Sequence, residues 1–341
     1  MKSVRRLLGC AVLAAAAIAT QASAYSSLIV FGDSLSDPGN AAALTAGASG
    51  PFFPPAPYAG TFSNGPTAAQ YLAASYGAPV VPGWPNATGA TNFAVGGALT
   101  GAGNYNFTIN SPSGLTAGYP QVGGTGIAQQ ITRYNPSGLN AADTLFMLWG
   151  GPNDIFLALA QAQAGIPVSF AAVVTQAVTN MAGNIAALAA LGAKSILVPN
   201  MPDLGLTPFA LGAGLGALTT GITDSFNAGL KNAIGLQRMA LAPLGVNLYE
   251  FDSAQSFRST IAAPPPGITQ VTTSCLSGGL AAIVGGCAGY LFFDDVHPTT
   301  FAHSLIASQL AAAAVPIPEP GTWALMTAGI ALLGWRARRR R

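Results

Sequence analysis

Residues 27–40 read Ser27-Leu28-Ile29-Val30-Phe31-Gly32-Asp33-Ser34-Leu35-Ser36-Asp37-Pro38-Gly39-Asn40. The segment opens with an apolar, β-prone run of about five residues, typical of a buried strand, and the run ends abruptly at Gly32. A serine just past the carboxyl end of a strand lies at the crevice where open α/β sheets bind ligands. Ser34 is therefore a candidate nucleophile, and a serine that only caps a strand-to-helix turn is the alternative.

Further apolar runs along the chain predict a sheet. Strands are predicted at 91–97, 144–149, 195–198 and 246–251, and a last apolar run covers 290–293. Helices are predicted at 67–76, 169–191, 219–241 and 300–314. Strands that alternate with helices favour a parallel sheet covered on both faces, with all strand ends at one edge. The proline- and glycine-rich stretch 46–65 is predicted as a loop placed to line one wall of a site at that edge.

Histidine is scarce, and its scarcity narrows the choice of a general base. The sequence holds only His297 and His303. His297 follows an apolar run and has Asp294 and Asp295 beside it, so a carboxylate is available to orient its ring. His303 falls inside the last predicted helix, where we expect it to pack or to face solvent. A loop histidine bonded to nearby backbone is the alternative for His297.

The two ends of the chain are predicted to be targeting segments. Residues 1–24 combine a basic start, an apolar core and a small-residue cleavage site, Ala22-Ser23-Ala24, which is the pattern of a secretory signal peptide. Cys10 belongs to this segment. We expect signal peptidase to remove residues 1–24, so that the mature chain begins at Tyr25 and is exported.

Residues 316–341 contain Pro318-Glu319-Pro320, an apolar run over 322–335 and an arginine-rich end. The run is short for permanently spanning ~30 Å of hydrocarbon. The segment resembles the PEP-CTERM sorting signal of Gram-negative bacteria. The resemblance implies export across the inner membrane, transient membrane association through the C-terminal helix, removal by an exosortase-type protease, and a cell-surface or extracellular location. A plain membrane anchor is the alternative.

The charge of the chain is dominated by these ends. Residues 25–315 carry five basic and ten acidic side chains, a net charge of −5, although the whole sequence has a formal charge of +2. A basic face for nucleic acid is therefore not expected. The remaining cysteines, Cys275 and Cys287, suggest one disulfide that closes a loop in an exported protein. Two cysteines without nearby histidines do not complete a metal site.

Motifs for cofactors are also missing from the sequence. No Walker loop or dinucleotide fingerprint follows any predicted strand, so no cofactor is expected. Asp294-Asp295-Val296-His297 could suggest a metal site, but with only two histidines and no supporting cluster no metal is expected. The Gly-x-Ser-x-Gly elbow of ordinary α/β-hydrolases is absent as well.

Four blocks, in this order, resemble the GDSL (SGNH) hydrolases, especially their secreted lipase/phospholipase-like branch. The blocks are Phe31 to Asn40, Asn92-Phe93-Ala94-Val95-Gly96-Gly97-Ala98, Gly151-Pro152-Asn153-Asp154 and Asp294-Asp295-Val296-His297-Pro298-Thr299. Further agreement lies at Phe62 to Pro66 and Asn200 to Pro208. The resemblance covers roughly residues 27–312 and implies one domain over 25–315. The implied fold is a flavodoxin-like three-layer α/β/α sandwich with a mostly parallel sheet of about five strands.

The resemblance also implies roles for individual residues. Ser34 would be the nucleophile, His297 the base and Asp294 the orienting acid, with Asp295 as the alternative acid. The oxyanion hole would use the backbone N–H of Ser34, the backbone N–H of Gly97 (or of Gly96) and the side chain of Asn153.

The predicted function is therefore an exported serine esterase that forms an acyl-enzyme on Ser34 and acts on a lipid or other apolar ester. A polysaccharide O-acetylesterase or acyltransferase is the alternative enzyme. A surface or matrix protein on a non-catalytic scaffold is the alternative from another class.

Overall fold

The computed structural model describes residues 25–46, 57–108 and 119–315, together with residues 329 and 336. The predicted signal peptide lies outside these residues, as do nearly all of the predicted sorting segment, part of the predicted loop 46–65 and residues 109–118. Within the described ranges, no helix combines the length and apolar character needed to cross a membrane.

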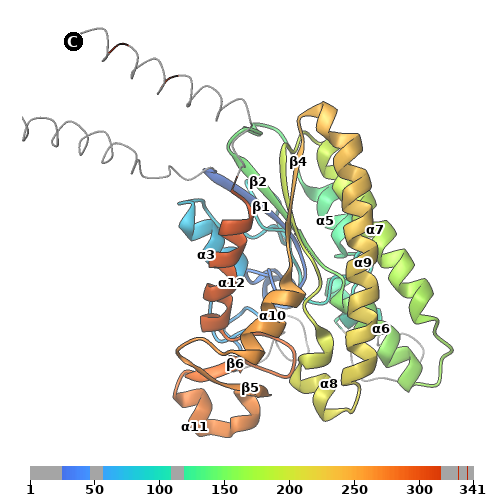
Figure 1. The fold of residues 1–341 in the computed structure, drawn as a ribbon, viewed down its shortest axis with the longest axis vertical. Helices are drawn as coiled ribbons and strands as arrows, with labels where there is room; N and C mark the ends of the chain where they lie inside the picture. Colours follow the sequence, from blue (N-terminus) through green and yellow to red (C-terminus); the bar gives the residue numbers. More distant parts are fainter. Residues whose placement is uncertain (1–24, 47–56, 109–118, 316–328, 330–335, 337–341) are drawn as a thin grey trace, which may run out of the picture.

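A parallel sheet of four strands forms the centre of the fold (Figure 1), in the order β1-β2-β3-β4. The strands are β1 (Ser27–Gly32), β2 (Thr144–Trp149), β3 (Ser195–Pro199) and β4 (Asn247–Phe251). Pairing is parallel throughout, with Ser27 opposite Thr144 and Ser195 opposite Asn247. The carboxyl ends of the strands therefore meet at one edge, as predicted.

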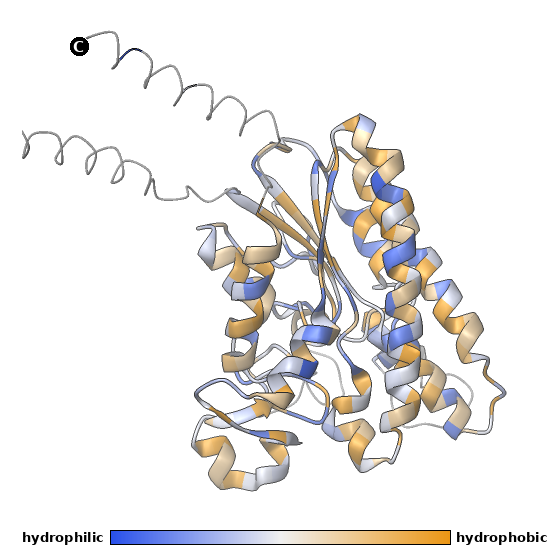
Figure 2. Cartoon of the chain, in the orientation of Figure 1, coloured by the Kyte–Doolittle hydropathy of each residue, from blue (hydrophilic) through white to orange (hydrophobic). Residues whose placement is uncertain are grey.

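Helices cover both faces of this sheet. One face packs against α5 (Ile127–Arg133), α6 (Pro152–Gln163), α7 (Phe170–Ala190) and α9 (Gly216–Leu241). The other face packs against α3 (Ala68–Ser75) and α12 (Thr300–Ala313). Alternate residues of β1 enter the two layers: Ile29 and Phe31 join the first core, whereas Leu28 and Val30 join the second. Figure 2 shows hydrophobic residues along the middle of the sheet and mixed colours along α9. The predicted three-layer α/β fold is confirmed.

The predicted strand at 91–97 is the first correction, because the main sheet has four strands rather than about five. This segment does run beside β1: Val30 N–H donates to Thr91 O (2.9 Å), and Phe93 N–H donates to Val30 O (2.8 Å). It forms only isolated bridges, at Asn92. On the side away from β1, the N–H groups of Thr91 and Asn92 donate to Val81 O, and Asn40 Nδ2 donates to both Asn92 O and Ala94 O.

The apolar run 290–293 is the second correction. It forms β6 (Gly289–Phe292), which pairs in parallel with β5 (Ile268–Ser274) in a separate two-stranded sheet. The sequence did not predict β5, whose side chains are mostly exposed. Figure 1 shows this small sheet below the main one, at the end where the main strands finish. The residues that follow β6 thus still reach the edge of the main sheet.

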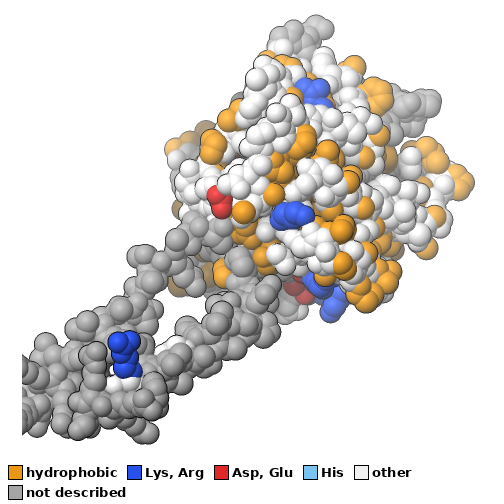
Figure 3. Space-filling model, turned by 90° about the horizontal axis from the view of Figure 1, so that it is seen from above, with side chains coloured by type: hydrophobic (Ala, Val, Ile, Leu, Met, Phe, Trp, Pro, Cys, Tyr) orange, Lys and Arg blue, Asp and Glu red, His pale blue; other side chains and the backbone are white. Residues whose placement is uncertain are grey.

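Shorter elements complete the described chain. The helices are α2 (Asn40–Thr45), α4 (Tyr105–Thr108), α8 (Pro208–Gly212), α10 (Ser253–Ala262) and α11 (Gly279–Val284), and the 3₁₀ turns are Pro120–Val122, Leu204–Leu206, Ala242–Leu244 and Leu276–Gly278. On the face seen in Figure 3, few charged side chains stand among many polar and apolar ones. Arg238 pairs with Glu250, and Arg258 pairs with Asp203 and Asp224.

Candidate active site

Ser34 lies in a tight turn directly after β1. Asp33 Oδ1 accepts the N–H of Leu35 (3.0 Å), and Asp33 O accepts the N–H of Ser36 (3.1 Å). Behind the turn, the side-chain amide of Gln130 bonds to both the N–H and the carbonyl of Gly32, each at 2.8 Å. These bonds fix the backbone that carries the Ser34 hydroxyl, so the side chain is held by the sheet rather than by a mobile loop.

His297 lies on the loop between β6 and α12 and meets Ser34 directly. The distance from His297 Nε2 to Ser34 Oγ is 2.8 Å, and the distance from His297 Nδ1 to Asp294 Oδ2 is 2.6 Å. With hydrogen on Nδ1, the ring donates to Asp294 and its Nε2 accepts the Ser34 hydroxyl. This arrangement allows the imidazole to take a proton from the serine while the carboxylate balances the positive charge that forms.

Asp294, and not Asp295, is the acid beside His297. Its Oδ1 accepts the N–H groups of Val296 (2.8 Å) and His297 (2.7 Å). Burial acts to raise the pKa of Asp294, but His297 and the hydrogen bonds from His297, Tyr58 and Val296 outweigh it and lower this pKa to about 2. The carboxylate is therefore ionised near neutral pH. The side chain of Asp295 instead accepts a hydrogen bond from Ser274 Oγ (2.9 Å).

His303 lies within α12 and is fully buried. Its Nδ1 accepts the N–H of Ala68 at 3.2 Å, which links α12 to α3. Burial lowers the pKa of His303 to about 3, so the ring is neutral near pH 7. Of the two positions expected for His303, packed or facing solvent, the structure shows the packed one.

Two of the predicted oxyanion donors are backbone N–H groups. Gly96 N–H donates to Asp37 Oδ2 at 2.8 Å and is already used. The N–H groups of Ser34 and Gly97 have no hydrogen-bond partner among the described residues. Gly97 has a φ of +84°, and a Cβ there would collide with the side chains of Asn104 and Asn106. The geometry thus favours Gly97 over Gly96 as a donor and explains why the position is glycine.

The third predicted donor is Asn153, in the first turn of α6. Pro152 begins this helix, where its missing N–H costs nothing. One hydrogen of Asn153 Nδ2 goes to Ala98 O at 3.2 Å, and the amide has a second hydrogen to offer. Ser34, Gly97, Asn153, Asp294 and His297 all line the same pocket.

This pocket has a volume of about 840 Å³ and is mostly apolar. Its lining includes Phe156, Phe170, Phe209, Leu215, Phe257 and Leu305, contributed by helices α6 to α10 and α12 or by their connections. The predicted loop contributes Tyr58 and Phe62. The sequence did not single out the apolar residues from the helices, because apolar residues at helical spacing are indistinguishable from ordinary core positions.

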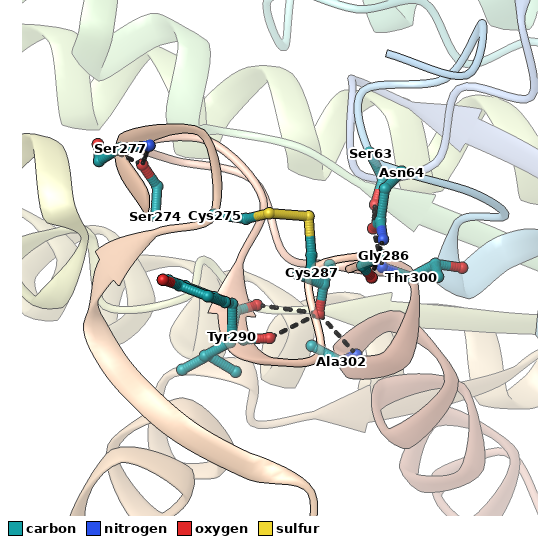
Figure 4. The surroundings of a disulfide bond; sticks show 12 residues. Ser63, Asn64, Ser274, Cys275, Ser277, Gly286, Cys287, Tyr290, Thr300 and Ala302 are labelled. Carbon is teal, nitrogen blue, oxygen red and sulfur yellow. Dashed lines mark hydrogen bonds between the residues drawn. A yellow bond between two sulfur atoms is a disulfide. The ribbon is translucent and has the colours of Figure 1, made fainter. Parts of the chain in front are cut away.

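The small sheet next to the pocket is cross-linked. Cys275 and Cys287 form a disulfide with a Cα–Cα distance of 5.4 Å, drawn in yellow in Figure 4. It joins the end of β5 to the turn before β6. Within the described residues, no group of three His, Cys, Asp or Glu side chains is placed to hold a metal ion.

Two family models match the sequence. The model of GDSL-like lipases/acylhydrolases matches residues 28–310, and that of the PEP-CTERM protein-sorting motif matches residues 316–341.

Individual proteins are similar as well. The chain is 27% identical to the phosphatidylcholine-sterol acyltransferase of Aeromonas hydrophila, over 84% of this chain and 90% of that protein. It is 29% identical to an uncharacterized protein in the trpE-trpG intergenic region of Pseudomonas putida, over 84% of this chain and 48% of the relative. It is also 29% identical to lipase 1 of Photorhabdus luminescens, over 55% of this chain and 24% of the relative. The chain therefore spans about half or less of the last two proteins.

Proposed function

Because the chain belongs to the GDSL-like lipase/acylhydrolase family, we propose that it is an exported serine hydrolase that cleaves lipid acyl esters. The observation that carries this proposal is the line of hydrogen bonds from Ser34 through His297 to Asp294, placed at the wall of an apolar pocket. A nucleophile, a base and an orienting carboxylate in this order are the requirements of acyl transfer through a covalent intermediate.

In the first half of the reaction, Ser34 Oγ attacks the carbonyl carbon of the ester while His297 Nε2 accepts the hydroxyl proton. The negative charge that develops on the carbonyl oxygen is stabilised by the N–H groups of Ser34 and Gly97 and by the Asn153 amide. When the tetrahedral intermediate collapses, the protonated His297 gives its proton to the departing alkoxide. The alcohol leaves, and the acyl group remains on Ser34.

In the second half, water enters in place of the alcohol. His297 takes one proton from the water, and the resulting hydroxide attacks the acyl carbon. The second tetrahedral intermediate collapses with return of the proton to Ser34 Oγ, which releases the carboxylic acid. Asp294 remains ionised throughout and stabilises the imidazolium in both halves.

The pocket supports a lipid acyl group as the substrate class. Its lining is mostly apolar and holds several phenylalanines, which gain free energy from an alkyl chain at ~25 cal/mol per Å² of apolar surface removed from water. An acetyl group would fill little of about 840 Å³. The pocket therefore favours a longer acyl chain over the O-acetyl esters of a polysaccharide.

Acyl transfer to an alcohol is a second candidate function. It is favoured by the similarity to the phosphatidylcholine-sterol acyltransferase, which extends over 90% of that protein. The chemistry requires only that an alcohol replaces water in the second half of the reaction. Acyl transfer is distinguished from hydrolysis by measuring ester and free fatty acid products when an acceptor alcohol is added.

The proposal also covers the N-terminal and C-terminal segments of the chain, which we assign to export and sorting. The sorting-motif match at 316–341 supports export and sorting to the surface of a Gram-negative bacterium, with processing by an exosortase-type protease. We assign 1–24 to the signal peptide and 25–315 to the hydrolase domain. Residues 316–341 would hold the chain in the membrane before processing.

The test is turnover of p-nitrophenyl acetate, butyrate and palmitate by the purified protein, with Ser34→Ala alongside. We expect turnover of butyrate and palmitate esters and none by Ser34→Ala. Activity confined to acetate would contradict the lipid substrate class, and a folded wild type inactive on all three esters would contradict the hydrolase itself.

A further inference from the structure

The carboxylate of Asp294 has a fourth donor, which comes from outside its own loop. Its Oδ2 accepts the Tyr58 hydroxyl at 2.7 Å as well as His297 Nδ1 at 2.6 Å. The two donors thus share a single carboxylate oxygen. Tyr58 is 236 positions away from Asp294 in the sequence and follows the proline-rich stretch.

The aromatic ring of Tyr58 is held so that its hydroxyl points at this oxygen. It lies edge-on to Phe293, with ring centroids 5.0 Å apart, and against Phe62 at 6.4 Å. Burial, together with the negative charge and hydrogen bond of Asp294, raises the pKa of Tyr58 above its ordinary value. The hydroxyl therefore stays protonated and acts as a donor.

The residues after Tyr58 hold the rest of the histidine loop. The Phe62 ring lies 5.4 Å from the ring of His297, and Ser63 Oγ donates to Pro298 O at 2.8 Å. Asn64 Oδ1 accepts the N–H of Thr300 (2.9 Å) while its Nδ2 donates to Gly286 O (3.0 Å). Figure 4 shows Asn64 beside both partners, next to the disulfide. Residues 58–64 thus form a brace along the loop that carries Asp294 and His297.

We propose that Tyr58 is a positioning residue for the reaction: its hydroxyl holds the Asp294 carboxylate against His297 and limits how much negative charge that oxygen offers to the ring. This inference rests on the proposed function. The alternative is that Tyr58 only packs, in which case the aromatic ring matters and the hydroxyl does not.

Removal of the hydroxyl has two predictable effects. The carboxylate loses one of the bonds that fix its rotation, so the ring of His297 is held less well for proton transfer and kcat falls. Asp294 Oδ2 also keeps more negative charge for its remaining partner, which stabilises the imidazolium. The acid limb of the kcat/KM profile therefore moves to higher pH.

The first experiment compares Tyr58→Phe with the wild type on p-nitrophenyl butyrate across pH 5–9. We expect kcat to fall about tenfold, the value of one hydrogen bond to a charged group, with KM little changed. We expect the midpoint of the acid limb of the kcat/KM profile to move to higher pH by about 0.5–1 unit. Tyr71→Phe is the matched control, because it removes another tyrosine hydroxyl bond, to Thr300 Oγ1 at 2.9 Å, and should leave the profile unchanged. An unaltered kcat and profile in Tyr58→Phe would overturn the proposal.

A second measurement does not depend on turnover. The proton between His297 Nδ1 and Asp294 should give a far-downfield proton NMR resonance, assigned by its loss in His297→Gln. We expect Tyr58→Phe to move this resonance further downfield and Tyr71→Phe to leave it in place. A resonance that Tyr58→Phe does not move would refute the role of Tyr58 even if the protein hydrolyses no ester, whereas inactivity with a moved resonance would count against the proposed function alone.

Discussion

Ser34 Oγ and His297 Nε2 lie 2.8 Å apart although 263 positions separate them in the sequence. The two residues come from different sheets: Ser34 follows β1 of the main sheet, and His297 follows β6 of the small one. The small sheet packs with α10 and α12 in one apolar cluster, and this packing places the loop after β6 beside Ser34.

The choice of Asp294 over Asp295 predicts very different effects for two adjacent substitutions. Asp294→Asn should lower kcat about 10⁴-fold, because the amide favours the wrong tautomer of the ring. Asp295→Asn removes a charge that does not touch His297 and leaves an amide oxygen that can still accept from Ser274 Oγ, so kcat should stay close to wild type. Steady-state kinetics on one ester measures both. Equal losses in the two variants would contradict the assignment of the acid.

Asn153→Ala should remove one oxyanion donor. We expect kcat to fall about 10²–10³-fold with KM little changed, because the donor acts on charge that exists only in the transition state. Asn184→Ala is the control: this buried amide of α7 donates to Thr100 O and does not line the pocket. It should lower the thermal midpoint and spare kcat. An Asn153→Ala enzyme with wild-type kcat would exclude Asn153 from the hole.

Gly97→Ala should strain the backbone at residue 97 and also lower esterase activity. The residue has φ +84°, and the new methyl group would push against Asn104 and Asn106, of which Asn106 lines the pocket. Gly138→Ala places alanine at nearly the same φ, +80°, with nothing within 4 Å of the new Cβ. Both variants should lose about 1–3 kcal/mol of stability from the backbone alone. Only Gly97→Ala should also lose esterase activity, measured where both variants are fully folded.

The burial of His303 should make the free energy of unfolding depend on pH. Because its pKa is lowered from 6.5 to about 3 in the folded protein, the stability it contributes is present above pH 6.5 and is lost as the pH falls toward 3. The wild type should lose about 1.4 kcal/mol per pH unit in this range relative to His303→Gln, which does not titrate. Denaturant unfolding of both proteins at pH 7, 6 and 5 tests this. A constant difference across these pH values would show that the ring is not kept neutral by burial.

The polar part of the candidate site could be proposed from the sequence, whereas its apolar part could not. Ser34, Asn153, Asp294 and His297 each lie in a short block whose chemistry is readable without knowing the fold. Phe209 and Phe257, by contrast, line the pocket because α8 and α10 lie at the end of the sheet. Nothing in their spacing separates a pocket wall from a core position.

The two errors in the predicted fold have similar causes. Residues 91–97 have the composition of a strand and run along β1, but their remaining polar groups bond to the irregular segment at Val81 and to side chains such as Asn40 rather than to another strand. β5 was missed because its exposed threonines give no apolar pattern. In both cases tertiary contacts rather than local propensity determine the outcome.

Covalent labelling of Ser34 tests the proposed mechanism most directly. The purified protein is treated with diethyl p-nitrophenyl phosphate, which transfers a diethylphosphoryl group to an activated serine, and is then digested and examined by mass spectrometry. The mechanism predicts one diethylphosphoryl group per chain, on Ser34, in step with the loss of esterase activity. His297→Gln should slow the labelling strongly, and Ser34→Ala should abolish it. Labelling of a different residue, or full esterase activity in the labelled protein, would contradict the assignment of Ser34 as the nucleophile.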